Sequence, residues 1–343
     1  MKNAPSSIVV VGTSAGGMDA LSRLVAQFPV DFPAAVFIVQ HMAADNTGDI
    51  LVQTLAKKGT LGCTLALDGE PIEAGHIYVG RPDHHLLVEK GKVLVTKGAR
   101  ENRSRPSIDP LFRSAAVAYG NRVIGVLLTG YLDDGTSGMI AIKRCGGTTV
   151  VQDPNDAAYP DMPQNALNNL KVDHCLPLAS MGKLLVDLVQ KRPPARTDIP
   201  KDIVVEAKIA KRVLSDLKAV ESLGDQVPFN CPACGGVLWQ MTKGKLIRFR
   251  CHTGHAFTSS VLLAEQTERI EETLWVALRM FEERKNLLTT LVEANGGRGS
   301  RSASERAKES DVHIERIRDM LLSSDKASND EPRNAARKLT RPV

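Results

Sequence analysis

A serine lies in a glycine-rich turn directly after the first strongly apolar segment of the chain. Residues 8–11 are Ile and Val, and the segment from Gly12 to Gly17 has the sequence Gly-Thr-Ser-Ala-Gly-Gly, with Ser14 at its centre. A G-x-S-x-G turn between a buried strand and a helix can expose a nucleophilic hydroxyl, because its small residues permit a sharp turn and leave the serine uncrowded. By itself the motif is weak, since most serines in such turns bond only their own backbone.

Two further apolar segments end in the residue types that a nucleophilic serine needs. His41 follows residues 34–39, and Asp133 and Asp134 follow residues 123–128 after a short connection. The carboxyl ends of neighbouring strands in an open parallel sheet meet at one crevice, so these segments can bring a serine, a base and a carboxylate together. Each residue has a structural alternative, a histidine at a strand end or an aspartate that caps a helix, but together they predict a catalytic triad. The chain order Ser, His, Asp is not that of the α/β hydrolases.

A second group of residues, nearer the C-terminus, has the spacing of metal ligands: Cys231, Cys234, Cys251 and His255. The first pair is C-x-x-C, and the complete set can bind Zn²⁺ tetrahedrally without leaving a position for water, so a structural zinc is predicted. His252 is an alternative fourth ligand, and a redox pair or free thiols are alternatives to a metal site. Residues 236–241 and 245–250 are expected to form two strands of a zinc-ribbon hairpin. The other cysteines, which lack ligand spacing, are predicted to be buried thiols: Cys63, Cys145 and Cys175.

The elements that position these residues predict an α/β fold. We expect a doubly wound, mainly parallel sheet in three layers (α/β/α), followed by a small zinc-ribbon-like and α-helical C-terminal region. Prolines and charges without an apolar face indicate a linker after the sheet domain. Apolar residues at spacings of three, four and seven predict helices beyond the linker. The predicted parts are a catalytic domain at 1–190, a linker at 191–201, a helical region at 202–323 with the ribbon-like insert at about 228–258, and a disordered tail at 324–343.

Composition restricts the classes of protein that fit. The net charge of the 343 residues is +5 and is spread along the chain, which does not indicate nucleic-acid binding. No apolar run approaches the ~20 residues of a membrane span, and the N-terminus lacks the apolar region of a signal peptide. We therefore expect a cytoplasmic protein without membrane insertion.

Five sequence blocks resemble the catalytic domain of CheB-type protein-glutamate methylesterases. They occur in the family's order: Val9 to Gly17, Val39 to Met42, Gly75 to Val79, Arg105 to Phe112, and Leu128 to Gly135. The resemblance assigns the nucleophile to Ser14, the base to His41 and the orienting aspartate to Asp134. Asp133 stands where the family commonly has Asn, and Tyr131-Leu132 replaces its usual Met-Gly pair. The family's oxyanion donors correspond to the backbone N–H groups of Ala15 and Tyr131.

The activity that this resemblance implies is hydrolysis of glutamyl γ-methyl esters to glutamate and methanol, with no cofactor for catalysis. Deamidation of glutamine by the same serine is a second implied activity. The partner would be a methylated chemoreceptor or another methyl-accepting sensory protein. Arg105 would lie near the cleft and contact acidic receptor side chains, with a solvated loop arginine as the alternative.

Regulation is expected to differ from the family's usual architecture, in which a receiver domain precedes the catalytic domain. The first strand begins by residue 8, so we expect no receiver in cis, and residues 200–322 would dock a partner or gate the cleft instead. Two other functions fit the sequence: a non-catalytic sensory scaffold that binds a partner through the ribbon and helices, and a serine esterase or amidase for another substrate.

Overall fold

The computed structural model describes residues 5–191, 197–211, 217–294 and 300–338, and of residues 243, 300 and 324–338 it describes the backbone alone. The chain forms two compact units, Met1–Leu262 and Leu263–Val343. The first contains the sheet, its helices and the ribbon-like region, and the second consists of helices. Residues 192–196 of the predicted linker lie outside the described residues.

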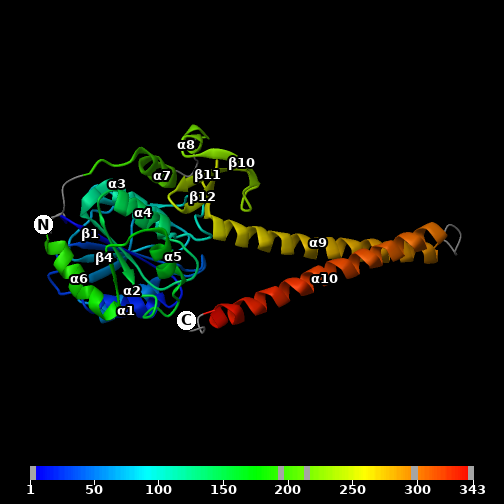
Figure 1. The fold of residues 1–343 in the computed structure, drawn as a ribbon, viewed down its shortest axis with the longest axis horizontal. Coiled ribbons are helices and arrows are strands. Elements are labelled where there is room, and N and C mark those ends of the chain that lie inside the picture. Colours follow the sequence, from blue (N-terminus) through cyan, green and yellow to red (C-terminus); the bar gives the residue numbers. More distant parts are fainter. Residues whose placement is uncertain (1–4, 192–196, 212–216, 295–299, 339–343) are drawn as a thin grey trace. The chain divides into compact units, whose positions relative to one another are not determined.

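A seven-stranded parallel sheet forms the centre of the first unit (Figure 1). The strand order is β3-β4-β2-β1-β7-β8-β9, and every pairing in it is parallel. The chain winds from β1 to one edge and returns to β7 to wind to the other edge, which confirms the predicted doubly wound fold. The strands are β1 Ile8–Thr13, β2 Ala35–Gln40, β3 Gly62–Leu65, β4 His76–Val79, β7 Val123–Leu127, β8 Thr148–Gln152 and β9 His174–Leu176.

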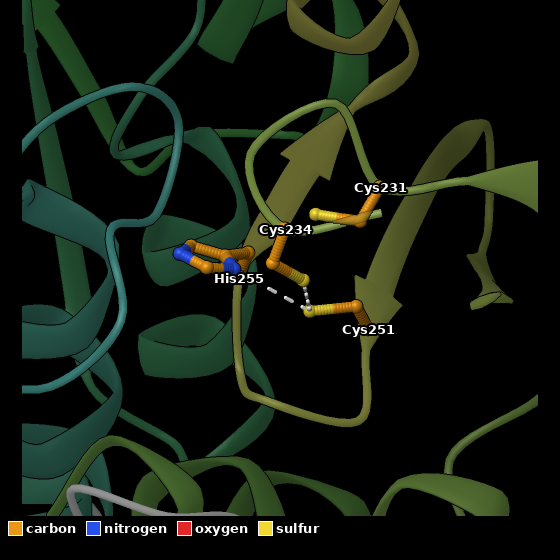
Figure 2. A group of neighbouring side chains, drawn as sticks. All are labelled: Cys231, Cys234, Cys251 and His255. Carbon is orange, nitrogen blue, oxygen red and sulfur yellow. Dashed lines mark hydrogen bonds between the residues drawn. The ribbon is translucent and has the colours of Figure 1, made fainter. Parts of the chain in front are cut away.

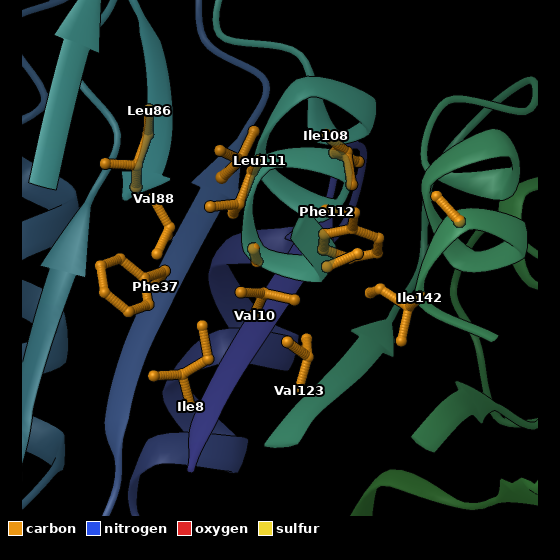
Figure 3. Close-up of a cluster of buried hydrophobic side chains, with 14 of the residues drawn as sticks. Ile8, Val10, Phe37, Leu86, Val88, Ile108, Leu111, Phe112, Val123 and Ile142 are labelled. Carbon is orange, nitrogen blue, oxygen red and sulfur yellow. The ribbon is translucent and has the colours of Figure 1, made fainter. Parts of the chain in front are cut away.

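Helices cover both faces of this sheet, because the inner strands are apolar on both sides. In β1, Ile8 and Val10 pack in the cluster below α3 and α4 (Figure 3), whereas Val9 and Val11 face the opposite layer with α1 and α6. The helices are α1 Gly17–Val25, α2 Asp49–Lys58, α3 Ile108–Tyr119, α4 Thr136–Arg144, α5 Asp161–Asn169 and α6 Leu178–Gln190. A separate hairpin joins β5 His85–Glu89 to β6 Lys92–Thr96, and a 3-10 turn, Gly120–Arg122, precedes β7.

An antiparallel four-stranded sheet, which we call the ribbon, belongs to the same compact unit. Its strands are β10 Asp225–Asn230, β11 Val237–Lys243, β12 Leu246–Cys251 and β13 Ala256–Thr258, after α7 Lys201–Lys211 and α8 Leu217–Glu221. The predicted hairpin corresponds to β11 and β12, which turn at Gly244 with a φ of 61°. β10 and β13 were not predicted, because neither has a distinctive apolar pattern.

The remaining cysteines differ in exposure. Cys145 is buried as predicted and Cys63 is half-buried, but Cys175 is exposed. The prediction of a buried thiol is wrong for Cys175 because its strand, β9, is the edge of the sheet.

A buried network of charges joins the ribbon and α7 to the sheet domain. Arg248 of β12 donates two hydrogen bonds to Glu206 of α7, at 2.7 and 2.8 Å. Arg250 donates to Glu101 at 3.0 Å, and Arg113 of α3 donates to the other oxygen of the same carboxylate. The five side chains are at most 7% exposed. Each buried charge therefore depends on partners from another element, so the network fixes these elements against one another.

The second unit contains most of α9 Ser259–Ala294 and all of α10 Ser300–Lys338. Leu278 of α9 packs with Ile314, Ile317 and Leu321 of α10, and Arg318 forms an ion pair with Glu282 at 2.9 Å. α10 continues to Lys338, into the segment that the sequence predicted to be disordered, and residues 339–343 lie outside the described part. Among the described helices, none has the length and apolar character needed to cross a bilayer.

We predict that Glu206→Gln lowers the free energy of unfolding by about 3–5 kcal/mol at pH 7, because it leaves buried arginines without full compensation. Burial alone would raise the pKa of Glu206, but Arg248 and Arg113 hold this pKa well below its usual value. The ionised carboxylate therefore stabilises the fold above about pH 4.5, and this contribution declines as the pH falls further. Denaturant unfolding at several pH values measures both effects.

Asp19→Asn is the control, because Asp19 is exposed and pairs with the exposed Arg23. Its cost should stay below about 1 kcal/mol. Equal costs for the two variants would contradict the expected penalty for leaving the buried arginines without Glu206.

Candidate functional site

Three predicted residues meet at the carboxyl ends of adjacent strands. Ser14 follows β1, His41 follows β2, and Asp134 follows β7, and these strands are neighbours in the order β2-β1-β7. The His41 Nδ1 lies 3.1 Å from the Ser14 Oγ, and the His41 Nε2 lies 2.7 Å from an Asp134 carboxylate oxygen. The structure thus brings serine, imidazole and carboxylate into a continuous hydrogen-bonded chain.

Backbone contacts fix the turn that carries Ser14. Gly16 has a φ of 76°, in the left-handed region that favours glycine. A Cβ on Gly17 would lie 1.9 Å from the Gln40 Oε1, so any larger residue there would displace the Gln40 side chain. The Gln40 Nε2 donates to the Ser14 carbonyl at 2.8 Å, and the Ser14 N–H donates to the Thr129 carbonyl at 3.0 Å. The serine is consequently held by strands on both sides.

The buried carboxylate of Asp134 accepts several hydrogen bonds besides the one from His41. Donors include the Ser107 hydroxyl at 2.9 Å, the Ile108 N–H at 2.8 Å and the Asn102 Nδ2 at 3.0 Å. Burial alone would raise the pKa of Asp134, but the hydrogen bond and charge of His41, with these donors, lower it to about 2. An ionised Asp134 accepts a hydrogen bond from the His41 Nε2–H, so the lone pair of Nδ1 faces Ser14.

Three residues of this site were missed by the sequence predictions: Asn102, Ser107 and Asp109. Ser107 occupies the N-cap position of α3, a position typical of serine, but its hydroxyl donates to Asp134 instead of capping its own helix. Asp134 itself accepts the first N–H groups of α3, where the helix dipole favours negative charge. Ser107 could have been identified from capping preferences, whereas nothing in the sequence indicated Asn102.

Asp133, the neighbour of Asp134, has a different environment. Its carboxylate accepts hydrogen bonds from the Thr258 hydroxyl at 2.8 Å and the Ser260 hydroxyl at 2.6 Å. Burial raises the pKa of Asp133. Asp133 therefore contacts the end of the ribbon, and only Asp134 contacts His41.

Arg105, the predicted substrate contact, is engaged within the protein. Its guanidinium donates to the Asp83 carboxylate and, at 2.8 Å, to the Gly98 carbonyl. Its side chain is 17% exposed. A substrate could use only the N–H groups that these two acceptors leave free.

One of the two backbone groups expected to stabilise an oxyanion belongs to Ala15, which follows Ser14, and the other to Tyr131, whose neighbour Gly130 packs against the Ser14 Cβ. Within the described part of the chain, the N–H groups of Ala15 and Tyr131 donate to no other protein atom. The segment before Tyr131 is anchored, because Gly130 donates to the Tyr159 carbonyl and accepts from the Met162 N–H, both at 3.0 Å. The altered Tyr131-Leu132 pair is thus accommodated with Leu132 at a φ of 62°, and the exposed Tyr131 ring lies 4.6 Å from that of Tyr159.

The Cys and His residues form a separate cluster in the ribbon (Figure 2). Ligand atoms of Cys231, Cys234, Cys251 and His255 all lie within 4.8 Å of one another. The Cys234 and Cys251 sulfurs are 3.7 Å apart, and the Cys251 sulfur is 3.5 Å from the His255 Nδ1. A tetrahedral zinc at ordinary bond lengths separates two sulfurs by about 3.8 Å and a sulfur from a nitrogen by about 3.6 Å. The dimensions of the cluster therefore fit a zinc ion, and His255 is the histidine that lies in it.

Comparison with known proteins gives one family. The family model described as CheB methylesterase matches residues 9–185, slightly more than half of the chain. The crystal structure of the Thermotoga maritima CheB methylesterase catalytic domain is similar, with a TM-score of 0.51 and 33% identity. The match covers 53% of this chain and 98% of that one.

Curated relatives match over the same part of the chain. A Leptospira interrogans protein, named provisionally as a protein-glutamate methylesterase/protein-glutamine glutaminase, is 39% identical over 53% of this chain and 94% of its own length. Proteins with that name from Methanosarcina mazei and Anaeromyxobacter dehalogenans are 34% and 37% identical over 55% and 53% of this chain. The chain matches only 53% of the length of each of these two proteins.

Gly130→Ala should slow the reaction of Ser14 with a fluorophosphonate by at least about tenfold. The new methyl group would lie 2.7 Å from the Ser14 Cβ and 2.1 Å from the Met162 sulfur, and a small displacement of a nucleophile has large kinetic effects. Gly80→Ala is the matched control, since its methyl group would make only ordinary contacts of 3.4 Å or more. Equal labelling rates for both variants and the wild type would show that the Ser14 geometry does not control its reactivity.

Proposed function

The chain belongs to the CheB methylesterase family, and on that premise we propose that it hydrolyses glutamyl γ-methyl esters of a methyl-accepting chemoreceptor. The hydrogen-bonded series from Ser14 through His41 to the buried Asp134 is the observation that carries this proposal. Relatives named protein-glutamate methylesterase/protein-glutamine glutaminase support the substrate class. They also support deamidation of receptor glutamines as a second activity.

The first half of the reaction forms an acyl-enzyme. The His41 Nδ1 removes the Ser14 hydroxyl proton while the serine oxygen attacks the ester carbonyl. Asp134 keeps the other ring nitrogen protonated and stabilises the imidazolium that forms. The N–H groups of Ala15 and Tyr131 stabilise the negative charge on the carbonyl oxygen. His41 then returns the proton to the departing methoxide, and methanol leaves.

The second half releases the enzyme. His41 removes a proton from water as the water oxygen attacks the acyl carbonyl, and the proton returns to Ser14 when the acyl bond breaks. The product is a free glutamate side chain. With a glutamine substrate the same steps release ammonia, because His41 protonates the leaving nitrogen.

Substrate contact through Arg105 remains a proposal. An acidic receptor side chain would approach the guanidinium N–H groups that Asp83 and Gly98 leave free. The pairing with Asp83 and Gly98, which is only partly buried, holds the guanidinium in one orientation, which suits recognition of a carboxylate.

The Cys/His cluster is proposed to hold a structural Zn²⁺. Three sulfurs and one nitrogen supply a full tetrahedral set, so the ion would stabilise the ribbon and take no part in ester hydrolysis. A site of reduced thiolates also supports a cytoplasmic location, where cysteines are kept reduced.

The C-terminal helices are proposed to dock a partner. α9 exposes the apolar side chains of Val276, Met280, Leu287 and Leu291, which lie on one face of the helix because their spacings are four and seven residues. A contiguous exposed apolar face is typical of a contact surface.

Methanol release from a fully methylated receptor fragment tests the activity. Ser14→Ala should reduce the rate by more than about 1,000-fold, because the nucleophile is lost. Ser180→Ala, which removes an exposed hydroxyl on α6, is the control and should leave the rate unchanged. Release that persists in Ser14→Ala would disprove the proposed mechanism.

Metal analysis tests the zinc site. The purified protein should contain about one zinc per chain, and Cys234→Ser should lower both the zinc content and the melting temperature. Cys175→Ser, at an exposed cysteine outside the cluster, should change neither. Equal zinc contents in the two variants would rule out the cluster as the ligand set.

A further inference from the structure

The last strand of the ribbon, β13, lies beside the loop that carries Asn102. The Asn102 N–H donates to the Ala256 carbonyl at 2.8 Å, and the Ala256 N–H donates to the Arg100 carbonyl at 3.4 Å. The Thr258 N–H donates to the Asn102 Oδ1 at 3.2 Å. Both the backbone and the side chain of Asn102 are therefore bonded to β13.

The other end of the same amide reaches the candidate catalytic site. The Asn102 Nδ2 donates to Asp134 and to Asp109, each at 3.0 Å. Asn102 is only 6% exposed, so water does not compete freely for these bonds. A single side chain thus accepts a hydrogen bond from β13 and donates one to the carboxylate that contacts His41. Its φ of 49° is tolerated better by asparagine than by most residues.

A second contact runs from β13 and the first turn of α9 to the residue next to Asp134. The Thr258 and Ser260 hydroxyls donate to the two oxygens of Asp133, at 2.8 and 2.6 Å. Asp134 is therefore flanked by two residues, Asn102 in space and Asp133 in sequence, that both contact the end of the ribbon.

We propose that β13 positions Asp134 through Asn102 and Asp133, so that the ribbon sets the alignment of the His41 imidazole. The proposal deepens the proposed function and rests on it, because it requires His41 to act on Ser14. The family model matches residues 9–185, so β13 and the rest of the ribbon lie outside the matched part of the chain.

The carboxylate keeps other donors when the Asn102 contact is lost, including Ser107 and the Ile108 N–H. Asp134 therefore stays in place approximately, but with fewer constraints on its orientation. Loss of one hydrogen bond to a charged group corresponds to a change of about tenfold or more in rate when that group acts in the transition state. Substrate binding should be unaffected, because Asn102 and Thr258 act through other residues.

Asn102→Asp tests the first contact. The substitution preserves the shape of the side chain and the acceptor for the Thr258 N–H, but replaces the donor to Asp134 with a carboxylate oxygen. We expect kcat for methanol release to fall by at least about tenfold, with KM within about twofold of the wild type. The rate constant for labelling of Ser14 by a fluorophosphonate should fall in parallel, while the final amount of label stays at one per chain. A merely misfolded fraction would lower the final amount and leave the rate constant unchanged.

Thr258→Val tests the contact between Thr258 and Asp133, and its result does not depend on whether Asn102→Asp folds. It removes the hydroxyl bonded to Asp133 at nearly constant volume and should lower the same rate constants by about three- to fivefold. Thr242→Val is the matched control, because it makes the same change at an exposed position of β11 in the same ribbon. Its rate constants should equal those of the wild type.

The two measurements separate failure of this inference from failure of the proposed function. Unchanged labelling and turnover in both Asn102→Asp and Thr258→Val would overturn the positioning role and leave the esterase intact. If the labelling rate constants of both variants fall as expected but the wild type releases no methanol, the positioning role is supported and the proposed receptor ester is refuted as the substrate. A wild type that the fluorophosphonate does not label would overturn both.

Discussion

The buried carboxylate of Asp134 is the constraint on which the rest of the site depends. A buried charge of this kind is stable only when several donors surround it, and here they come from His41, Ser107, Asn102 and the first turn of α3. Each of these donors lies where it can form a hydrogen bond with the Asp134 carboxylate. The imidazole consequently has one orientation and one tautomer, and Ser14 faces its free lone pair.

A second set of buried charges determines where the ribbon lies in the first unit. Arg248 and Arg250 of β12 extend into the sheet domain and pair with Glu206 and Glu101, and Arg113 of α3 completes the group. Such pairs add little net stability compared with apolar packing, but they are costly to break one partner at a time. The charged pairs therefore hold the ribbon in a definite position, with β13 beside Asn102. A purely apolar contact would restrict this position less, because apolar packing is not directional.

The relation between the sequence and the site differs from residue to residue. Ser14, His41 and the Asp133–Asp134 pair were predictable because each follows an apolar strand, and strand ends converge in a parallel sheet. The choice of Asp134 came from the family resemblance. Asn102 was not predictable, since it lies in a loop and gains its role only when β13 arrives from 154 residues later in the chain. Arg105 was chosen from the same region, yet its guanidinium turns to Asp83. Short local patterns do not encode which of several polar loop residues will face a distant strand.

The sequence by itself determined the doubly wound sheet, a serine, a histidine and two adjacent aspartates at its strand ends, and three cysteines with metal-ligand spacing beside two candidate histidines. Apolar periodicity, glycine in tight turns and ligand spacing are local properties, so they can be recognised without coordinates. Only the tertiary structure decided that His255 and not His252 joins the cluster, that Asp134 and not Asp133 contacts His41, and that the ribbon belongs with the sheet domain. These three outcomes depend on contacts between segments that are far apart in the chain. A local sequence pattern does not show which buried polar groups will meet at such contacts and form hydrogen bonds.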